Sequence, residues 1–322
     1  MNSGRACPLY YRYSPDVFSQ AATIRAETIY VIGGLYGNQP ALDAIHLLAA
    51  NENVTPTLVF NGDFNWFDVN PDDFAAINID VLKHVALRGN VETELANLTD
   101  DGCGCAYPDS VNDAEVERSN EIMATLKKTA RQVPSLTDTL SKLPMTAVAE
   151  VGAARIGIVH GDAASLAGWR FAHDALNETA NQTWLHEVCA DNQLAGFASS
   201  HTCLPTFRRF QRFGVDAARH FVINNGAAGM PNFGGTAYGL LTRISIHHAP
   251  DDITQYGDTI NGIHVDAIPV HYDTDAFVKT FLRDWPAGSP AHTSYFGRIT
   301  NGPDFAPPHA LGLIKPSAPS CG

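Results

Sequence analysis

No apolar run in the sequence approaches the ~20 residues that a membrane-spanning helix needs, so we expect no transmembrane helix and no membrane partner. The stretch MNSGRACPLYYRYSPDVF at the start lacks the apolar core segment of a signal peptide, and we therefore expect a cytoplasmic protein. The sequence also contains no internal repeat and no low-complexity tract.

Positive charge is scarce. The chain has 21 Lys and Arg residues against 34 Asp and Glu residues, which gives a formal net charge of −13. Proteins that bind nucleic acids neutralise phosphates with a basic face, so we expect no nucleic-acid partner. This balance is compatible with a small phosphorylated substrate that is held by a metal ion or by a few local donors.

Cysteine is also sparse, with six residues scattered along the chain. In a reducing compartment such cysteines are free thiols. The one close pair, Cys103 and Cys105 in the stretch GCGC, has a single residue between its cysteines, whereas metal-binding and redox pairs usually have two. We interpret this pair as two thiols in a loop.

The chain does contain enough apolar residues, 45% of 322, for the core of one large α/β domain with appended ends. Apolar β-rich runs at 27–34, 55–63 and 84–92 each end in glycine or in glycine followed by a polar residue. The segment 40–50 between the first two runs has helical spacing. This alternation predicts a mostly parallel sheet, whose ligands bind beyond the carboxyl ends of the strands.

The second half of the chain predicts further elements. We expect a long amphipathic helix at 112–132, a short helix at 134–142, a hairpin around Gly152 and a strand ending near 202. The runs 220–231, 237–246 and 262–273 are interpreted as the closing strands of a second sheet. After Asp284 the composition is rich in Pro, Gly, Ser and His, and we expect this part to wrap the surface.

Four polar residues follow apolar runs at predicted strand ends: Asp63, Asn90, His160 and His201. Taken singly, each is a common turn or hydrogen-bonding residue. Together, one carboxylate, one amide oxygen and two imidazoles form a coordination set for a divalent first-row metal ion. Because all four lie where α/β proteins bind ligands, they predict a shared metal site.

The order of these motifs resembles the calcineurin-like metallophosphoesterases over about residues 28–273, with the compact phosphodiesterase branch as the nearest match. The matching motifs are a glycine turn with Asn38, then Gly62-Asp63, Gly89-Asn90, His160-Gly161 and His201-Thr202. The stretch VINNGAAGMP at 222–231 is similar to the Asn-Pro-Gly-Ser loop of that branch, and 268–273 resembles its closing strand.

The resemblance implies two packed β-sheets flanked by helices, a four-layer α/β/β/α sandwich. It also implies a division of the chain. We expect an N-terminal extension over 1–26, a metallophosphoesterase-like domain over 27–284 with a helical insertion at 100–145, and a C-terminal wrapping tail over 285–322.

The sequence departs from the family at the first metal. The family's first turn reads Asp-x-His-Gly-Asn, and its Asp and His bind that metal. In this sequence Gly34 replaces the Asp and Tyr36 replaces the His. The family's Gly-His-x-His motif ends in a further ligand, which is replaced by Cys203. Three of the four ligands of the first metal are therefore altered.

The ligands of the second metal are complete in Asp63, Asn90, His160 and His201. The resemblance then implies a phosphoesterase that hydrolyses a phosphate mono- or diester at a reduced, single-metal site, with Asp63, Asn90 and His201 as catalytic residues. The cofactor that the resemblance implies is one divalent ion, such as Mn, Zn, Fe or Ni. Val91 stands where the family often has a proton-shuttling His or Cys, which favours a leaving group that needs little protonation.

Arginine side chains are candidates to replace the missing cation, because guanidinium groups match phosphate geometry. These candidates are Arg88, Arg170, Arg208, Arg209 and Arg212, and Arg170 in GWRF is the proposed substrate-binding residue.

Two alternatives remain open. A Tyr36 phenolate and a Cys203 thiolate would hold a second, different ion, although Gly34 leaves a ligand missing. Otherwise, the chain is a catalytically inactive binding or scaffold protein with the metallophosphoesterase fold.

Overall fold

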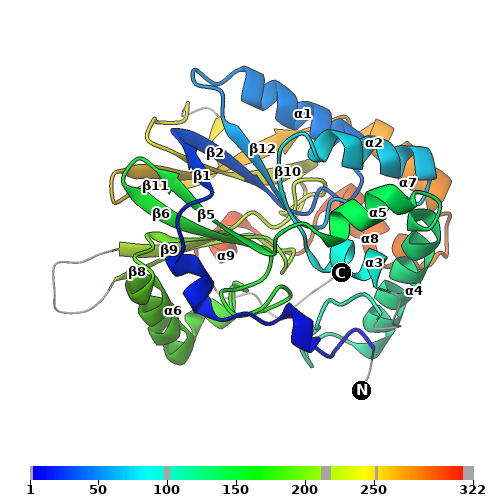
Figure 1. Cartoon of the computed structure of the whole chain (residues 1–322). Helices are drawn as coiled ribbons and strands as arrows, with labels where there is room; N and C mark the ends of the chain where they lie inside the picture. The colour runs from blue at the N-terminus through cyan, green and yellow to red at the C-terminus, as the bar shows by residue number, and fades with distance from the viewer. Residues whose placement is uncertain (1–2, 98–101, 212–218, 251–252, 315–322) are drawn as a thin grey trace.

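The computed structural model describes residues 3–97, 102–211, 219–250 and 253–314. Two sheets pack face to face, each with six strands among the described residues, in the orders β1-β5-β6-β7-β9-β8 and β11-β12-β10-β2-β3-β4. Helices cover the outer faces of both sheets (Figure 1). The predicted four-layer α/β sandwich is confirmed. In the described part of the chain, no helix combines the length and the apolar character that crossing a membrane requires.

The sheet that carries the N-terminal half contains the predicted parallel strands. Its parallel strands are β2 (Thr28–Ile32), β3 (Thr57–Asn61) and β4 (Val85–Leu87), and its antiparallel strands are β10 (Tyr238–Ser245), β12 (Ile263–His271) and β11 (Tyr256–Ile260). The assignment of 237–246 and 262–273 to a second sheet is wrong. β10 instead pairs with the free edge of β2, where every residue is buried and an unpaired edge would leave backbone groups unsatisfied.

The other sheet is built on the predicted hairpin. β5 (Thr146–Val151) and β6 (Ala154–Val159) pair antiparallel around Gly152, whose φ of 57° lies in the left-handed region that favours glycine. The remaining strands are β1 (Ile24–Ala26), β7 (Gly196–Ser199), β9 (Arg219–Asn224) and β8 (Thr206–Gln211). β6, β7 and β9 run parallel, so their carboxyl ends meet at one edge.

Period-two alternation in the strands separates the layers. In β2, Ile29 and Val31 lie in the core between the sheets, whereas Tyr30 and Ile32 lie in the core under the helices. The helices on that side are α1 (Gln39–Ala50), α2 (Pro71–Val81), α3 (Asn90–Ala96), α4 (Asp113–Ala130), α5 (Pro134–Ser141), α7 (Thr274–Asp284) and α8 (Pro290–Asn301). Helix α6 (Thr179–Asp191) packs on the outer face of the other sheet (Figure 1).

The short 3-10 segments η1 (Leu9–Tyr11), η2 (Pro15–Ser19) and η3 (Ala175–Asn177) and helix α9 (Pro307–Ala310) complete the described elements. The predicted long helix is confirmed as α4, with Asn112 as its N-cap. The five described cysteines are free thiols, and Cys321 lies outside the described residues.

The segment after Asp284, expected to wrap the surface, instead forms α8 and packs into the core. Ser289 caps α8 by accepting a hydrogen bond from the backbone N–H of His292, Pro290 occupies its first turn, and Ile299 is fully buried. Ser289 and Pro290 therefore mark the start of a helix and not an irregular surface segment. The proposed domain boundaries themselves stay a prediction.

Candidate metal centre

The four predicted ligands lie together at the seam between the two sheets. Asp63 follows β3, Asn90 begins α3 after β4, His160 follows β6, and His201 follows β7. β3 and β4 are neighbours in one sheet, and β6 and β7 are neighbours in the other. Each sheet therefore contributes two side chains from its carboxyl-end edge, and all four are buried.

The ligand atoms are spaced as around one metal ion. His160 Nε2 lies 3.3 Å from Asp63 Oδ2, 3.1 Å from Asn90 Oδ1 and 3.2 Å from His201 Nδ1. Ligand atoms of Asp63, His160 and His201 all lie within 4.8 Å of one another. Around an ion with bonds of about 2.1 Å, neighbouring ligand atoms are separated by about 3.0–3.4 Å. The observed separations match that range.

Backbone carbonyls orient both imidazole rings. His160 Nδ1 lies 2.9 Å from the carbonyl oxygen of Asn61, and His201 Nε2 lies 3.0 Å from that of Cys105. A carbonyl oxygen can only accept, so these two nitrogens carry the ring hydrogens. The lone pairs of His160 Nε2 and His201 Nδ1 then face each other beside two oxygens. Such a set of acceptors repels itself unless a cation lies between them, and it fits a divalent ion.

The pKa shifts agree with this arrangement. Burial, and then the neighbouring His160, lower the pKa of His201 to about 3, so this ring is neutral at physiological pH, the form in which an imidazole can bind a metal ion. Burial alone would lower the pKa of His160, but the Asp63 carboxylate outweighs it and the net shift is upward. The buried carboxylate of Asp63 thus favours a positive charge at His160 Nε2, where a metal ion would also lie.

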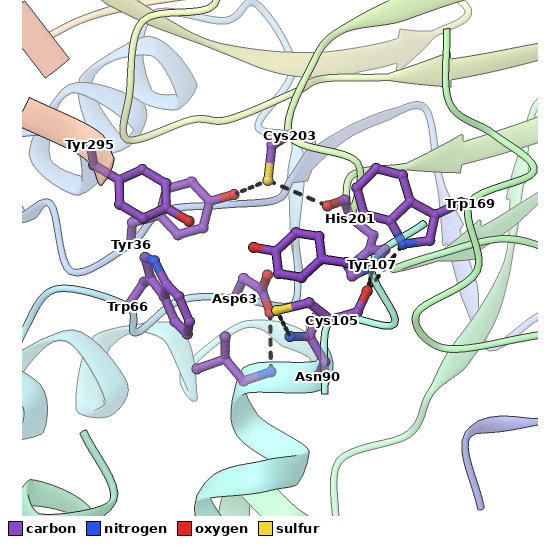
Figure 2. Close-up of a pocket in the computed structure, with 11 residues that line it drawn as sticks. Tyr36, Asp63, Trp66, Asn90, Cys105, Tyr107, Trp169, His201, Cys203 and Tyr295 are labelled. Carbon is purple, nitrogen blue, oxygen red and sulfur yellow. Dashed lines mark hydrogen bonds between the residues drawn. The ribbon is translucent and has the colours of Figure 1, made fainter. Parts of the chain in front are cut away.

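The loop at 102–105 positions two of the four side chains, a role that its sequence did not predict. The carbonyl oxygen of Cys103 accepts a hydrogen bond from Asn90 Nδ2 at 2.9 Å. The carbonyl oxygen of Cys105 accepts from both His201 Nε2 and Trp169 Nε1 at 3.0 Å (Figure 2). The contribution comes from backbone oxygens, so cysteine spacing carried no signal for it.

Glu92 connects the two turns that carry Asp63 and Asn90. Its Oε2 accepts from the backbone N–H groups of Asp63 at 2.8 Å and Gly89 at 2.9 Å, and its Oε1 accepts from Phe64 at 2.9 Å. Burial, and then the charge of Asp63, raise the pKa of Glu92 to about 7. The sequence analysis missed this residue, although a glutamate three positions after a helix N-cap commonly accepts from the N-cap backbone N–H, as Glu92 does from Gly89.

We expect Glu92→Gln to weaken metal binding by roughly 10–100-fold and to lower the free energy of unfolding by about 1–3 kcal/mol. The reason is that an amide NH₂ would face one of the backbone N–H groups that the carboxylate now accepts. Metal titration and thermal unfolding measure the two effects. Glu94→Gln is the matched control, because Glu94 is a buried carboxylate of the same helix that accepts from Tyr11 and not from the Asp63 turn. An equal loss of metal affinity in both variants would contradict the role of Glu92.

A small, mainly aromatic cavity adjoins the centre. It is lined by Tyr36, Asp63, Trp66, Asn90, Val91, Cys105, Tyr107, Trp169, His201, Cys203 and Tyr295 (Figure 2). Its volume of about 30 Å³ has room for one or two water molecules. Among the described residues, no lysine or arginine lines it. The five aromatic side chains come from loops and from α8, and the sequence analysis singled out only Tyr36.

Tyr36 and Cys203 occupy the altered side of the centre. A Cβ atom at Gly34, where φ is +65°, would lie 2.9 Å from Tyr36 Cζ and 2.9 Å from Tyr36 Oη. The ring of Tyr36 therefore fills the space of a side chain at position 34. Tyr36 Oη lies 3.2 Å from Cys203 Sγ, and burial raises the pKa of both groups. A protonated phenol and thiol that bond each other are poor metal ligands, which weighs against the mixed-ligand alternative.

The structure does not place the candidate arginines in this cavity. Arg170 lies with its guanidinium 4.3 Å from the ring centre of Trp184, Arg88 donates to the carbonyl oxygen of Ser141, and Arg209 pairs with Asp258. Arg208 donates to the carbonyl oxygen of His173, and neither residue lines the cavity. Arg212 lies outside the described residues.

No protein-family model and no curated protein matches the sequence. Solved structures do match the fold. The metallophosphoesterase from Sphaerobacter thermophilus aligns with a TM-score of 0.53 and 16% identity, covering 86% of this chain and 100% of that one. The hypothetical protein PH1004 from Pyrococcus horikoshii OT3 aligns with a TM-score of 0.55 and 15% identity, covering 86% of this chain and 99% of that one. The predicted metallophosphoesterase fold is thereby confirmed.

Proposed function

We propose that the chain is a metal-dependent phosphoesterase that hydrolyses a phosphate ester at a centre for one divalent ion. The observation that carries this proposal is the convergence of four lone-pair donors from Asp63, Asn90, His160 and His201 at the carboxyl-end edge of the sheets. The metallophosphoesterase fold of the chain supports it, because one structural neighbour with that fold is described as a metallophosphoesterase.

These four side chains would hold the ion, and the chain around them would keep them in place. When bound, such an ion lowers the pKa of a water molecule and polarises a phosphoryl oxygen. Asp63 supplies the negative charge, and the carbonyls of Asn61 and Cys105 fix the ring nitrogens of His160 and His201. The burial of all four excludes bulk water, which strengthens the electrostatic interactions at the centre.

We propose a single ion at this centre because the adjacent space is filled by protein. Tyr36 covers Gly34, and its hydroxyl bonds Cys203. Of the metals considered, Mn, Zn, Fe and Ni all accept imidazole together with oxygen ligands. The free, buried thiols of Cys103 and Cys105 support a reducing compartment, and hence a cytoplasmic location.

The charges of the centre favour an ester with one negative charge. A divalent ion and the Asp63 carboxylate leave a net charge of about +1, which the nearby Glu92 carboxyl lowers further when it is ionised, and no lysine or arginine among the described residues lines the cavity. A phosphodiester carries one negative charge and a monoester dianion carries two. The positive charge of the centre can therefore neutralise a diester, but it leaves a monoester with excess negative charge. The five rings of the cavity wall would contact an aryl or other apolar ester group, after rotating apart to admit it.

Val91 provides no proton for the leaving group, and the Tyr36 phenol has a pKa that burial raises. We therefore expect an ester whose leaving group departs as an anion, such as an aryl or nucleotidyl ester.

An assay of the metal-loaded protein on paired substrates tests this function. We expect hydrolysis of bis(p-nitrophenyl) phosphate to exceed that of p-nitrophenyl phosphate, with at least one of Mn²⁺, Zn²⁺, Fe²⁺ and Ni²⁺. Arg170→Ala is the control, and we expect it to keep the wild-type rate because Arg170 stacks on Trp184. If the loaded protein binds its ion but hydrolyses neither ester, the inactive binding or scaffold protein replaces the enzyme. The small volume of the cavity, about 30 Å³, is the observation that favours that alternative.

A further inference from the structure

A second group of metal-ligating side chains lies on the outer, helical side of the molecule. His46 is on helix α1, Asp80 is in the last turn of α2, and His84 lies in the turn between α2 and β4. Lys83 and His84 donate their backbone N–H groups to the carbonyls of Asp80 and Val81, so the helical path continues past the end of α2. The four-residue spacing then brings Asp80 and His84 to the same face.

The three side chains converge on one oxygen. His46 Nε2 lies 2.7 Å from Asp80 Oδ1, and His84 Nε2 lies 3.9 Å from the same atom. One ligand atom from each residue lies within 4.8 Å of the other two. The two rings have centres 5.4 Å apart and are tilted by 40°, so they present their Nε2 edges to the carboxylate without stacking face to face.

From these contacts we propose that His46, Asp80 and His84 form a second metal site, for a zinc-like divalent ion, that joins helix α1 to the end of helix α2. A set of two imidazoles and one carboxylate binds Zn²⁺, Co²⁺ and Ni²⁺ more tightly than Mg²⁺ and Ca²⁺, which favour oxygen ligands. A tetrahedral ion requires separations of about 3.3–3.5 Å between ligand atoms. The present values lie on either side of that range, so side-chain shifts of less than 1 Å suffice.

Two further features of the cluster determine which atoms can reach an ion. Within the described part of the chain, the imidazole of His84 makes no hydrogen bond, so its Nε2 is available to an ion. The ammonium of Lys83 lies 3.2 Å from Asp80 Oδ2, the oxygen that the two histidines do not face. This contact orients the carboxylate and leaves Oδ1 as a single ligand atom. The three ligand side chains are 27–36% exposed, so an ion can reach them from solvent.

The site is separate from the central metal centre. His84 precedes strand β4 and Asn90 follows it, and the three residues of this strand span about 10 Å. Helices α1 and α2 lie over the same sheet, at the top of Figure 1, and contribute Ile45 and Ile77 to the same core. An ion that bridges them binds only the folded chain and therefore stabilises it. This inference does not depend on the proposed phosphoesterase activity.

Zinc titration of the whole chain, followed by elemental analysis after dialysis, tests the proposal. We expect wild type to hold two zinc ions per chain, and His46→Asn and His84→Asn to hold one each. We also expect zinc in about 100-fold excess over its dissociation constant to raise the unfolding midpoint through this site by roughly 5 °C. This increment should be lost in both variants.

His247→Asn is the matched control. His247 is a half-exposed histidine that lies 2.8 Å from the carboxylate of Glu27, but among the described residues no third metal-ligating side chain completes a set with this pair. This variant should keep both ions. Asp63→Asn, which alters the central ligands only, should keep the outer ion, so the two sites are distinguished. If His46→Asn and His84→Asn both bind zinc with wild-type stoichiometry and affinity, or if Asp63→Asn binds none, the outer site is refuted.

Discussion

His201→Ala should lose the central metal ion and lower turnover of a phosphodiester by more than about 100-fold. Loss of a hydrogen-bonding partner of a metal ligand typically costs 10–100-fold, and His201 is proposed as a ligand itself. Its Nδ1 lies 3.2 Å from His160 Nε2, so its removal opens the set of donors on one side. Metal content after dialysis and the rate on bis(p-nitrophenyl) phosphate measure the two losses.

The fold should survive this substitution. The carbonyl oxygen of Cys105, which now accepts from His201 Nε2, keeps its second donor in Trp169 Nε1. His220→Ala is the matched control, because His220 is a buried histidine on β9 that does not line the cavity. We expect His220→Ala to retain the ion and the activity. A metal-loaded His201→Ala protein that turns over at the wild-type rate would exclude His201 from the centre.

Gly34→Asp should lower the free energy of unfolding by about 2–5 kcal/mol, and Tyr36→His should recover a large part of that loss. A residue other than glycine in the left-handed region costs roughly 1–2 kcal/mol, and overpacking a core costs about 1–3 kcal/mol more. Both terms apply here, because φ is +65° and the new Cβ would lie 2.9 Å from the Tyr36 ring. Thermal or denaturant unfolding of the two single variants and the double variant forms the test cycle.

Gly235→Asp separates the two costs. Gly235 also has a left-handed backbone, with φ of +72°, but a Cβ there would meet nothing within 4 Å. We expect this control to show the backbone cost alone, and Tyr36→His to leave it unchanged. If Gly34→Asp costs no more than Gly235→Asp, the ring of Tyr36 does not fill the space at position 34.

The same cycle extends to metal content. Gly34→Asp, Tyr36→His and Cys203→His combined replace the packed phenol and thiol with a carboxylate and two imidazoles beside Asp63. We expect the central ion count to rise from one to two per chain in a His84→Asn background, which removes the outer site. Histidine tolerates the left-handed backbone that Tyr36 and Cys203 adopt, with φ of 57° and 59°. A folded triple variant with an unchanged ion count would mean that these positions no longer form a metal site.

The sequence by itself determined the strand-helix alternation and the residues that end the strands. Asp63, Asn90, His160 and His201 could be identified because glycine turns after apolar runs mark strand ends, and parallel strands bring those ends to one edge. The sequence did not determine which sheet β10 and β12 join, because an apolar strand can pair with many partners. The pairing of β10 with the free edge of β2 places both strands in the first sheet.

The tertiary structure alone decided what surrounds these four side chains. The carbonyls of Asn61 and Cys105 determine which imidazole nitrogens face the centre. Because every residue has a backbone carbonyl, residue type does not predict these contacts. The packing of Tyr36 over Gly34 and against Cys203 joins residues 167 positions apart, a contact that only the folded chain defines. Local patterns specify which chemical groups lie at the strand ends, whereas long-range packing specifies their protonation, their neighbours and the space left for a metal ion.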